Sequence, residues 1–124
     1  MNRNNILAIF LLFPAAVQAA DDESRFVIWG VGQDSCNSYN LASAGNKADT
    51  YWSYVAGYLT AYNAFSTETY DISGGKDKDD ILAWLDDHCA DAQTSSLSDA
   101  LYKLVESHIE TRLQTVPGEG ARWP

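Results

Sequence analysis

The sequence predicts a small all-α fold, a four-helix bundle with one disulfide. Three observations support this prediction. Apolar side chains recur at helical spacing in four segments, and capping or helix-ending residues separate these segments. The third observation is that Cys36 and Cys89 are the only cysteines in the 124-residue sequence.

A predicted export signal precedes the domain. Residues 1–19 carry one positive charge at Arg3, an apolar run from Ile6 to Phe13 and a small-residue stretch that ends at Ala19. This order is typical of a signal peptide that is cleaved after Ala19. The apolar run is shorter than the roughly 20 residues needed to span a membrane, so we expect a periplasmic or secreted protein with no membrane attachment after cleavage.

Both cysteines lie in the expected mature chain. In an oxidising compartment, Cys36 and Cys89 leave one pairing to consider, or else two free thiols. A structural disulfide is the favoured interpretation because the sequence has no Cys-x-x-Cys motif and no clustered third ligand for a metal. The core of a domain of about 100 residues is modest, so such a cross-link would supply a large share of its stability.

The mature chain is predicted to have three parts: an N-terminal arm (residues 20–34), a helical domain (residues 35–115) and a flexible tail (residues 116–124). Within the arm, the apolar stretch from Phe26 to Trp29 is expected to be extended and packed on the domain.

The first helix is predicted over residues 36–44, with Asp34 and Ser35 as candidate caps and Gly45-Asn46 as its end. The second helix is predicted over residues 48–65. It is apolar nearly all round, which marks it as the expected central element. Gly57 and Ala61 on this helix are expected to serve plain packing against a neighbouring element.

A loop over residues 67–76 separates the second helix from the third, which Asp77 and Asp80 are expected to cap. Its inward residues are Ile81, Leu82, Leu85 and Cys89. The pattern Ser96-x-x-Asp99 predicts a capping box at the start of the fourth helix. The predicted buried face of that helix comprises Leu97, Leu101, Leu104, Val105, His108 and Ile109. A Cys36–Cys89 bridge would tie the first and third helices across the second.

Charge limits the partners. The sequence without residues 1–19 has seven Lys and Arg against seventeen Asp and Glu, a formal net charge of −10. Nucleic acid and anionic lipid are therefore not expected partners, because both require a cationic surface. Protonation of the carboxylates would reverse the net charge to about +10, and self-repulsion would then loosen the fold.

No motif predicts an enzyme, a metal site or a cofactor. Asp71-x-Ser73-x-Gly75 begins like a calcium loop, but Lys76 occupies the glycine position and Leu82 the position of the bidentate glutamate. His88 and His108 belong to no metal-binding motif, and His108 is expected in the interior. We therefore predict no catalytic residues, no metal ligands and no cofactor.

The predicted contact surface is aromatic. Tyr54, Tyr58 and Tyr62 recur every four residues on the second helix, and Trp52 lies near them. Packing at the rim of the core explains such a stripe, and so does a surface for a protein partner or for a homodimer, because tyrosine suits positions that are covered at one end and wet at the other. We predict that these four residues bind a partner.

Four motifs follow one another along the chain: Gly32-x-x-Ser35-Cys36, Trp52-x-x-x-x-Gly57-Tyr58-Leu59-x-Ala61-Tyr62-Asn63, Trp84-Leu85-Asp86-x-x-Cys89 and Leu97-x-x-Ala100. Their order resembles a widespread family of small uncharacterised secreted bacterial proteins. It is also distantly similar to the HdeA/HdeB periplasmic acid-stress chaperones and to the Tai-type immunity proteins of type VI secretion.

The resemblance implies an HdeA-like four-helix periplasmic domain in which Cys36 is paired with Cys89. HdeA-like proteins are dimers near neutral pH that open in acid and cover unfolded clients, whereas Tai-type proteins bind a toxin. The expected function is therefore a non-enzymatic protein-binding module of the acid-stress chaperone type. The alternatives are an immunity protein and, third, an enzyme or ion-binding protein.

Overall fold

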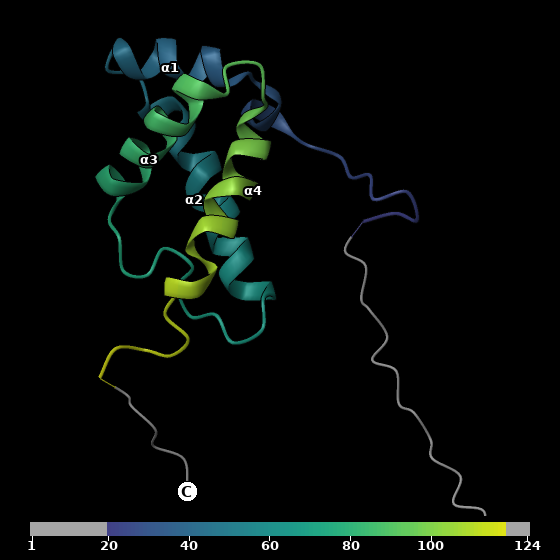
Figure 1. Ribbon diagram of the computed structural model, residues 1–124, viewed down its shortest axis with the longest axis vertical. Coiled ribbons are helices and arrows are strands. Elements are labelled where there is room, and N and C mark those ends of the chain that lie inside the picture. Colours follow the sequence, from purple (N-terminus) through teal and green to yellow (C-terminus); the bar gives the residue numbers. More distant parts are fainter. Residues whose placement is uncertain (1–19, 119–124) are drawn as a thin grey trace, which may run out of the picture.

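The computed structural model describes residues 20–118, so the predicted signal peptide and residues 119–124 of the predicted tail lie outside the described part of the chain. Four α-helices and two short 3-10 helices make up the fold (Figure 1). Their bounds, in chain order, are η1 (Gly30–Gln33), α1 (Cys36–Ala44), α2 (Asp49–Phe65), α3 (Lys78–Asp91), α4 (Leu97–His108) and η2 (Ile109–Thr111). The predicted small all-α fold with one disulfide is confirmed.

Three of the four α-helices begin where the sequence places capping residues, whereas α2 begins without a side-chain cap. The Ser35 side chain accepts a hydrogen bond from the backbone N–H of Ser38 at the start of α1. Complete capping boxes open α3 and α4, formed by Asp77 with Asp80 and by Ser96 with Asp99. Each box satisfies backbone N–H groups that a first helical turn would otherwise leave without partners, which fixes the helix boundary.

The most deeply buried helix is α4, and the prediction that α2 is central is wrong. Leu97, Leu101 and Leu104 of α4 are fully buried, and His108 is 4% exposed. Of the 17 residues of α2, only Tyr51, Val55 and Leu59 are buried. The reason is that the tyrosines of α2 are amphipathic and lie at the edge of the core, while its small residues face solvent.

The disulfide joins Cys36, the first residue of α1, to Cys89 near the end of α3, with 4.8 Å between the two Cα atoms. Helices α1 and α3 pack directly against each other. The bridge therefore ties the two predicted helices together, but it does not reach across α2.

The segment between α2 and α3 is an ordered part of the core rather than a simple loop. Ile72 is fully buried, and its N–H donates to Asn63 Oδ1 at 2.8 Å. Asp71 forms an isolated antiparallel bridge with Leu113, so this segment is held against the chain that follows α4.

A substitution at Gly74 should destabilise this junction. The backbone of Gly74 has φ +68°, and a Cβ there would lie 2.7 Å from the carbonyl oxygen of Thr111. We expect Gly74→Ala to lower the free energy of unfolding by about 1–3 kcal/mol, because alanine disfavours the left-handed conformation and the backbone of Thr111 would have to move. Urea unfolding followed by circular dichroism measures this loss.

Gly57→Ala is the matched control for Gly74→Ala. A Cβ at Gly57 has no neighbour within 4 Å, so the expected packing at this position is absent from the described structure. Alanine is favoured over glycine in an exposed helix, so stability should rise by up to about 1 kcal/mol. Equal effects of the two substitutions would show that the Gly74 junction is not constrained as the structure indicates.

Candidate functional site

A groove between α2 and α4 brings together tyrosines from both helices. It is lined by Tyr58, Tyr62, Tyr102, Val105, Glu106 and Ile109 and has a volume of about 380 Å³. We call this feature the tyrosine groove. Its walls are mainly aromatic and aliphatic, and Glu106 is its only charged lining residue.

Helical spacing explains how α2 contributes to the groove. Tyr54, Tyr58 and Tyr62 follow one another at intervals of four residues, so they lie along one face of α2. Each is half-buried and packs against the core, which fixes the ring while leaving part of it accessible. Two of these predicted contact residues, Tyr58 and Tyr62, line the groove.

Tyr54 has a different position. Its ring lies over Gly32 of η1, where a Cβ would be 2.0 Å from the tyrosine hydroxyl oxygen. Gly32 is therefore needed for this close approach, since any larger residue would displace the Tyr54 ring. Tyr54 is the first of the three tyrosines along α2, and it connects that helix to η1. It is not part of the groove wall.

Trp52 is also outside the groove. The ammonium group of Lys78 in α3 lies 5.6 Å from the centre of the Trp52 ring and is ion-paired with Asp49. Trp52 is half-buried against the core on the side of α2 that faces Lys78. The structure therefore does not bring the four predicted contact residues together in one site.

Tyr102 of α4 is the main groove residue that the sequence interpretation missed. It is 55% exposed and lies outside the apolar face of α4 that was predicted to be buried. A signal was present in the spacing, because Tyr102, Val105, Glu106 and Ile109 share one helical face. Nothing in the sequence indicated that this face adjoins the tyrosines of α2.

The groove is polar at its rim. Burial raises the pKa of Tyr58, and the nearby hydroxyl groups of Tyr54, Tyr102 and Tyr62 and the carboxylate of Asp99 raise it further. The pKa of Glu106 is lowered, mainly by its hydrogen bond with Lys103 at 2.8 Å and then by Tyr102. At neutral pH the groove therefore presents a neutral Tyr58 ring beside the Glu106 carboxylate, which is already ion-paired.

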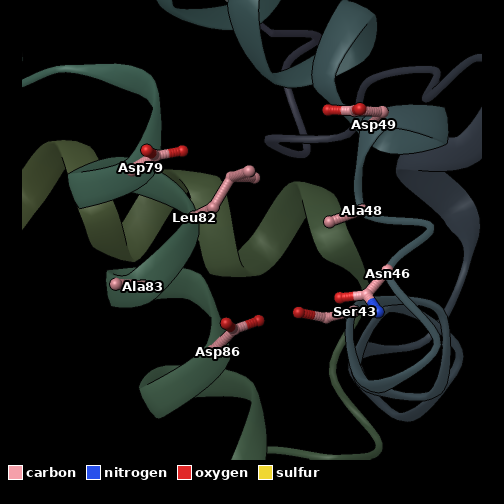
Figure 2. Close-up of a pocket in the computed structure, with 8 residues that line it drawn as sticks. All are labelled: Ser43, Asn46, Ala48, Asp49, Asp79, Leu82, Ala83 and Asp86. Carbon is pink, nitrogen blue, oxygen red and sulfur yellow. The ribbon is translucent and has the colours of Figure 1, made fainter.

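A second hollow is acidic. It has a volume of about 320 Å³ and is lined by Ser43, Asn46, Ala48, Asp49, Asp79, Leu82, Ala83 and Asp86. Figure 2 shows Asp86 and Ser43 pointing toward each other, with Asp79 and Asp49 on opposite sides of the hollow. Among the described residues, Asp86 Oδ1 is the buried side-chain oxygen that has no hydrogen-bond partner. Five of its eight lining side chains are polar, so it offers an apolar protein segment less contact than the tyrosine groove does.

The two histidines are held around one tryptophan. The Trp84 ring stacks on His88 with 4.9 Å between ring centres and meets the His108 ring edge-on at 6.2 Å. His108 Nδ1 lies 2.8 Å from the carbonyl oxygen of Leu104. The predicted interior position of His108 is confirmed.

The carboxylate of Asp71 is used within its own turn. It accepts hydrogen bonds from Ser73 N–H, Ser73 Oγ–H and Gly75 N–H at 2.8–3.0 Å. These bonds explain why the segment has the residue pattern of a calcium loop without its ligand arrangement. Within residues 20–118, no three His, Cys, Asp or Glu side chains are grouped so as to hold a metal ion.

No protein-family model, curated protein or solved structure matches this chain. None of the helices in the described range is long and apolar enough to cross a membrane. The Cys36–Cys89 disulfide fits a protein that folds in an oxidising environment. The class defined by these observations is a small, disulfide-linked all-α protein with an aromatic surface groove.

Proposed function

We propose that this protein is a non-enzymatic protein-binding module of the periplasm or extracellular space, and that the tyrosine groove is its contact surface. The observation that carries the proposal is the convergence of Tyr58, Tyr62 and Tyr102 from two helices around one hollow. Tyrosine is enriched at protein interfaces, because its rigid ring covers apolar surface at low entropic cost while its hydroxyl group stays hydrated.

The groove suits an apolar segment of a partner. Val105 and Ile109 contribute aliphatic side chains to its lining, and the tyrosines contribute aromatic rings. The hydroxyl groups that raise the pKa of Tyr58 also provide several donors and acceptors for the polar backbone of a bound segment. This combination recognises exposed hydrophobic stretches with little dependence on sequence.

Charge supports the acid-stress chaperone version of this function. The chain without residues 1–19 changes from a net charge of −10 to about +10 when its carboxylates are protonated. Self-repulsion in acid would loosen the fold and make its apolar surfaces more accessible to unfolded clients. The distant resemblance of the sequence motifs to the HdeA/HdeB chaperones implies the same function, and it forms part of this proposal.

The test is suppression of client aggregation. Residues 20–124 are mixed with acid-denatured malate dehydrogenase, and light scattering is recorded at pH 2–3 and during return to pH 7. We expect Tyr102→Ser to raise the concentration needed for half-maximal suppression about tenfold, because tyrosines at interface centres commonly contribute more than about 1 kcal/mol. Tyr102 is 55% exposed, so this variant should retain the fold.

Leu41→Ser is the matched control, since Leu41 of α1 is 68% exposed and lies outside the groove. Its activity should equal that of the unmodified protein. Equal loss in both variants, or no suppression at either pH, would refute the chaperone proposal. Tight binding of one toxin encoded by an adjacent gene at neutral pH, weakened by Tyr102→Ser, would instead favour the immunity function.

A further inference from the structure

The N-terminal arm exposes large apolar side chains. Phe26, Val27 and Trp29 are 66%, 72% and 79% exposed, so the expected packing of this stretch on its own domain is wrong. Figure 1 shows the arm leaving the helices and running away from them. Within the stretch from Phe26 to Trp29, only Ile28 is half-buried. Large exposed apolar side chains this close together in the sequence usually mark a surface that another molecule covers.

Hydrogen bonds hold both ends of this apolar stretch. At its root, Gln33 Nε2 donates to the carbonyl oxygen of Ile28 at 2.7 Å, and Ile28 lies against Gly32. At its far end, the Asp21 carboxylate accepts from the N–H groups of Glu23 and Arg25 and is ion-paired with Arg25. Trp29 has an extended backbone with φ −105° and ψ 149°, so the end of the stretch that joins the domain is held in one conformation, which lowers the entropic cost of docking.

The arm starts beside the tyrosine groove. Helix η1, which directly follows Trp29, packs against both α2 and α4, the two helices that form the groove. Gly32 of η1 lies under Tyr54, one helical turn before Tyr58. Figure 1 shows the arm running away from the helices that form the groove, so the groove of a second molecule is better placed to receive it.

Composition makes the arm and the groove complementary. Phe26 and Trp29 match the aromatic and aliphatic walls of the groove. Phenylalanine and tryptophan each bury about 150–250 Å². Two exchanged arms and the grooves that receive them would therefore bury on the order of 1,000 Å² or more, which reaches the size of specific interfaces.

We infer that two copies of this chain exchange arms, with Phe26, Val27 and Trp29 of each copy seated in the tyrosine groove of the other. The exchange is reciprocal, so one two-fold axis closes the assembly. This inference rests on the proposed function, because it assigns the occupant of the same groove in the absence of a client. The arm of a second copy and a client segment then compete for one site.

The first experiment is sedimentation velocity of residues 20–124 at pH 7 over 1–100 µM protein. The unmodified protein should sediment as a dimer, and the double variant Phe26→Ser with Trp29→Ser should raise the dimer dissociation constant at least tenfold. Leu41→Ser serves as the control and should leave the dimer intact. A monomeric unmodified protein at 100 µM, or an unchanged dimer in the double variant, would overturn the inference.

The second experiment identifies the surface that the arm occupies. A photo-crosslinking p-benzoylphenylalanine replaces Val27 in ¹⁵N-labelled protein, which is mixed with unlabelled protein before illumination. Mass spectrometry should find cross-links between labelled arm peptides and unlabelled peptides that contain Tyr58 or Tyr102. Cross-links only within one molecule, or only to surfaces outside the groove, would contradict arm exchange.

Client protection separates this inference from the proposed function. The double arm variant has an open groove, so it should suppress aggregation of malate dehydrogenase at least as well as the unmodified protein. A confirmed dimer without any client protection would remove the proposed function and keep arm exchange. A monomer that still protects clients through Tyr102 would remove arm exchange and keep the proposed function.

Discussion

Joint replacement of Cys36 and Cys89 by alanine is expected to lower the free energy of unfolding by about 4 kcal/mol. The bridge closes a loop with a sequence separation of 53, and removing it restores much conformational freedom to the unfolded chain. Helix α1 depends on this link, because Cys36 and Tyr39 are the only buried residues among its nine. Without the bridge, α1 is held by the Tyr39 side chain, by packing on α3 and by the backbone hydrogen bonds of Cys36 and Asn37 to Ser95 and Gln93.

Thermal unfolding measures this loss. For a domain of this size each 1 kcal/mol corresponds to a shift of about 4–8 °C, so the midpoint should fall by at least about 15 °C. Unmodified protein whose disulfide is reduced with a phosphine should unfold at nearly the same temperature as the double variant. A double variant that unfolds within 3 °C of the oxidised protein would contradict a stabilising role for the bridge.

Tyr39→Ala is expected to lower the free energy of unfolding by about 3–5 kcal/mol, the usual cost of deleting a buried aromatic ring. Tyr39 is fully buried, and its ring meets the Tyr51 ring edge-on with 5.5 Å between centres. Its hydroxyl group donates to the carbonyl oxygen of Leu82 in α3 at 3.2 Å. Burial, followed by the nearby Asp86 carboxylate, raises the pKa of Tyr39 strongly. The residue thus joins α1, α2 and α3 at one point.

Two further variants separate the contributions of the Tyr39 side chain. Tyr39→Phe keeps the ring and should cost only about 1 kcal/mol for the lost hydrogen bond. Tyr102→Ala removes a similar ring from an exposed position and should cost less than about 1 kcal/mol. Urea unfolding of the three variants tests this order. A Tyr39→Ala cost no greater than that of Tyr102→Ala would show that the α1–α3 junction is not part of the stabilising core.

Local signals predicted the helices well. Ser35, Asp77 and Ser96 each set a helix start that depends on a hydrogen bond within three residues, and these bonds form as expected. The same short range explains why the burial of Leu97, Leu101 and Leu104 was predictable from spacing alone. Such features need no knowledge of which helices are neighbours.

Features that depend on neighbouring elements were harder to predict. The apolar face of α2 was visible in the sequence, but not that α4 would occupy the centre and leave Gly57 uncovered. Tyr102 carries no local mark in the sequence, and it lines the groove only because α4 lies next to Tyr58 and Tyr62. The exposure of Trp29 was missed because its apolar side chain predicted packing on its own domain. Composition alone does not show whether an apolar residue packs within its own chain.

The proposed groove and arm suggest how one surface could be both protected and available. With arms exchanged, Phe26 and Trp29 cover the tyrosine groove, and the protein exposes less apolar surface. In acid the net charge of each copy without residues 1–19 would change from −10 to about +10, and repulsion between the two copies would then weaken the exchange. Release of the arms would open the groove under the conditions in which acid unfolds potential clients.

The central claim is that the tyrosine groove binds protein, and residue-resolved NMR with an acid-unfolded client tests it most directly. ¹H–¹⁵N spectra of residues 20–124 are recorded at pH 3 during titration with unfolded malate dehydrogenase. The account predicts that signals of Tyr58, Tyr62, Tyr102 and Ile109 shift or broaden first, and that Tyr102→Ser reduces these changes. Changes confined to the hollow around Asp86, or a spectrum that does not respond to client, would contradict it.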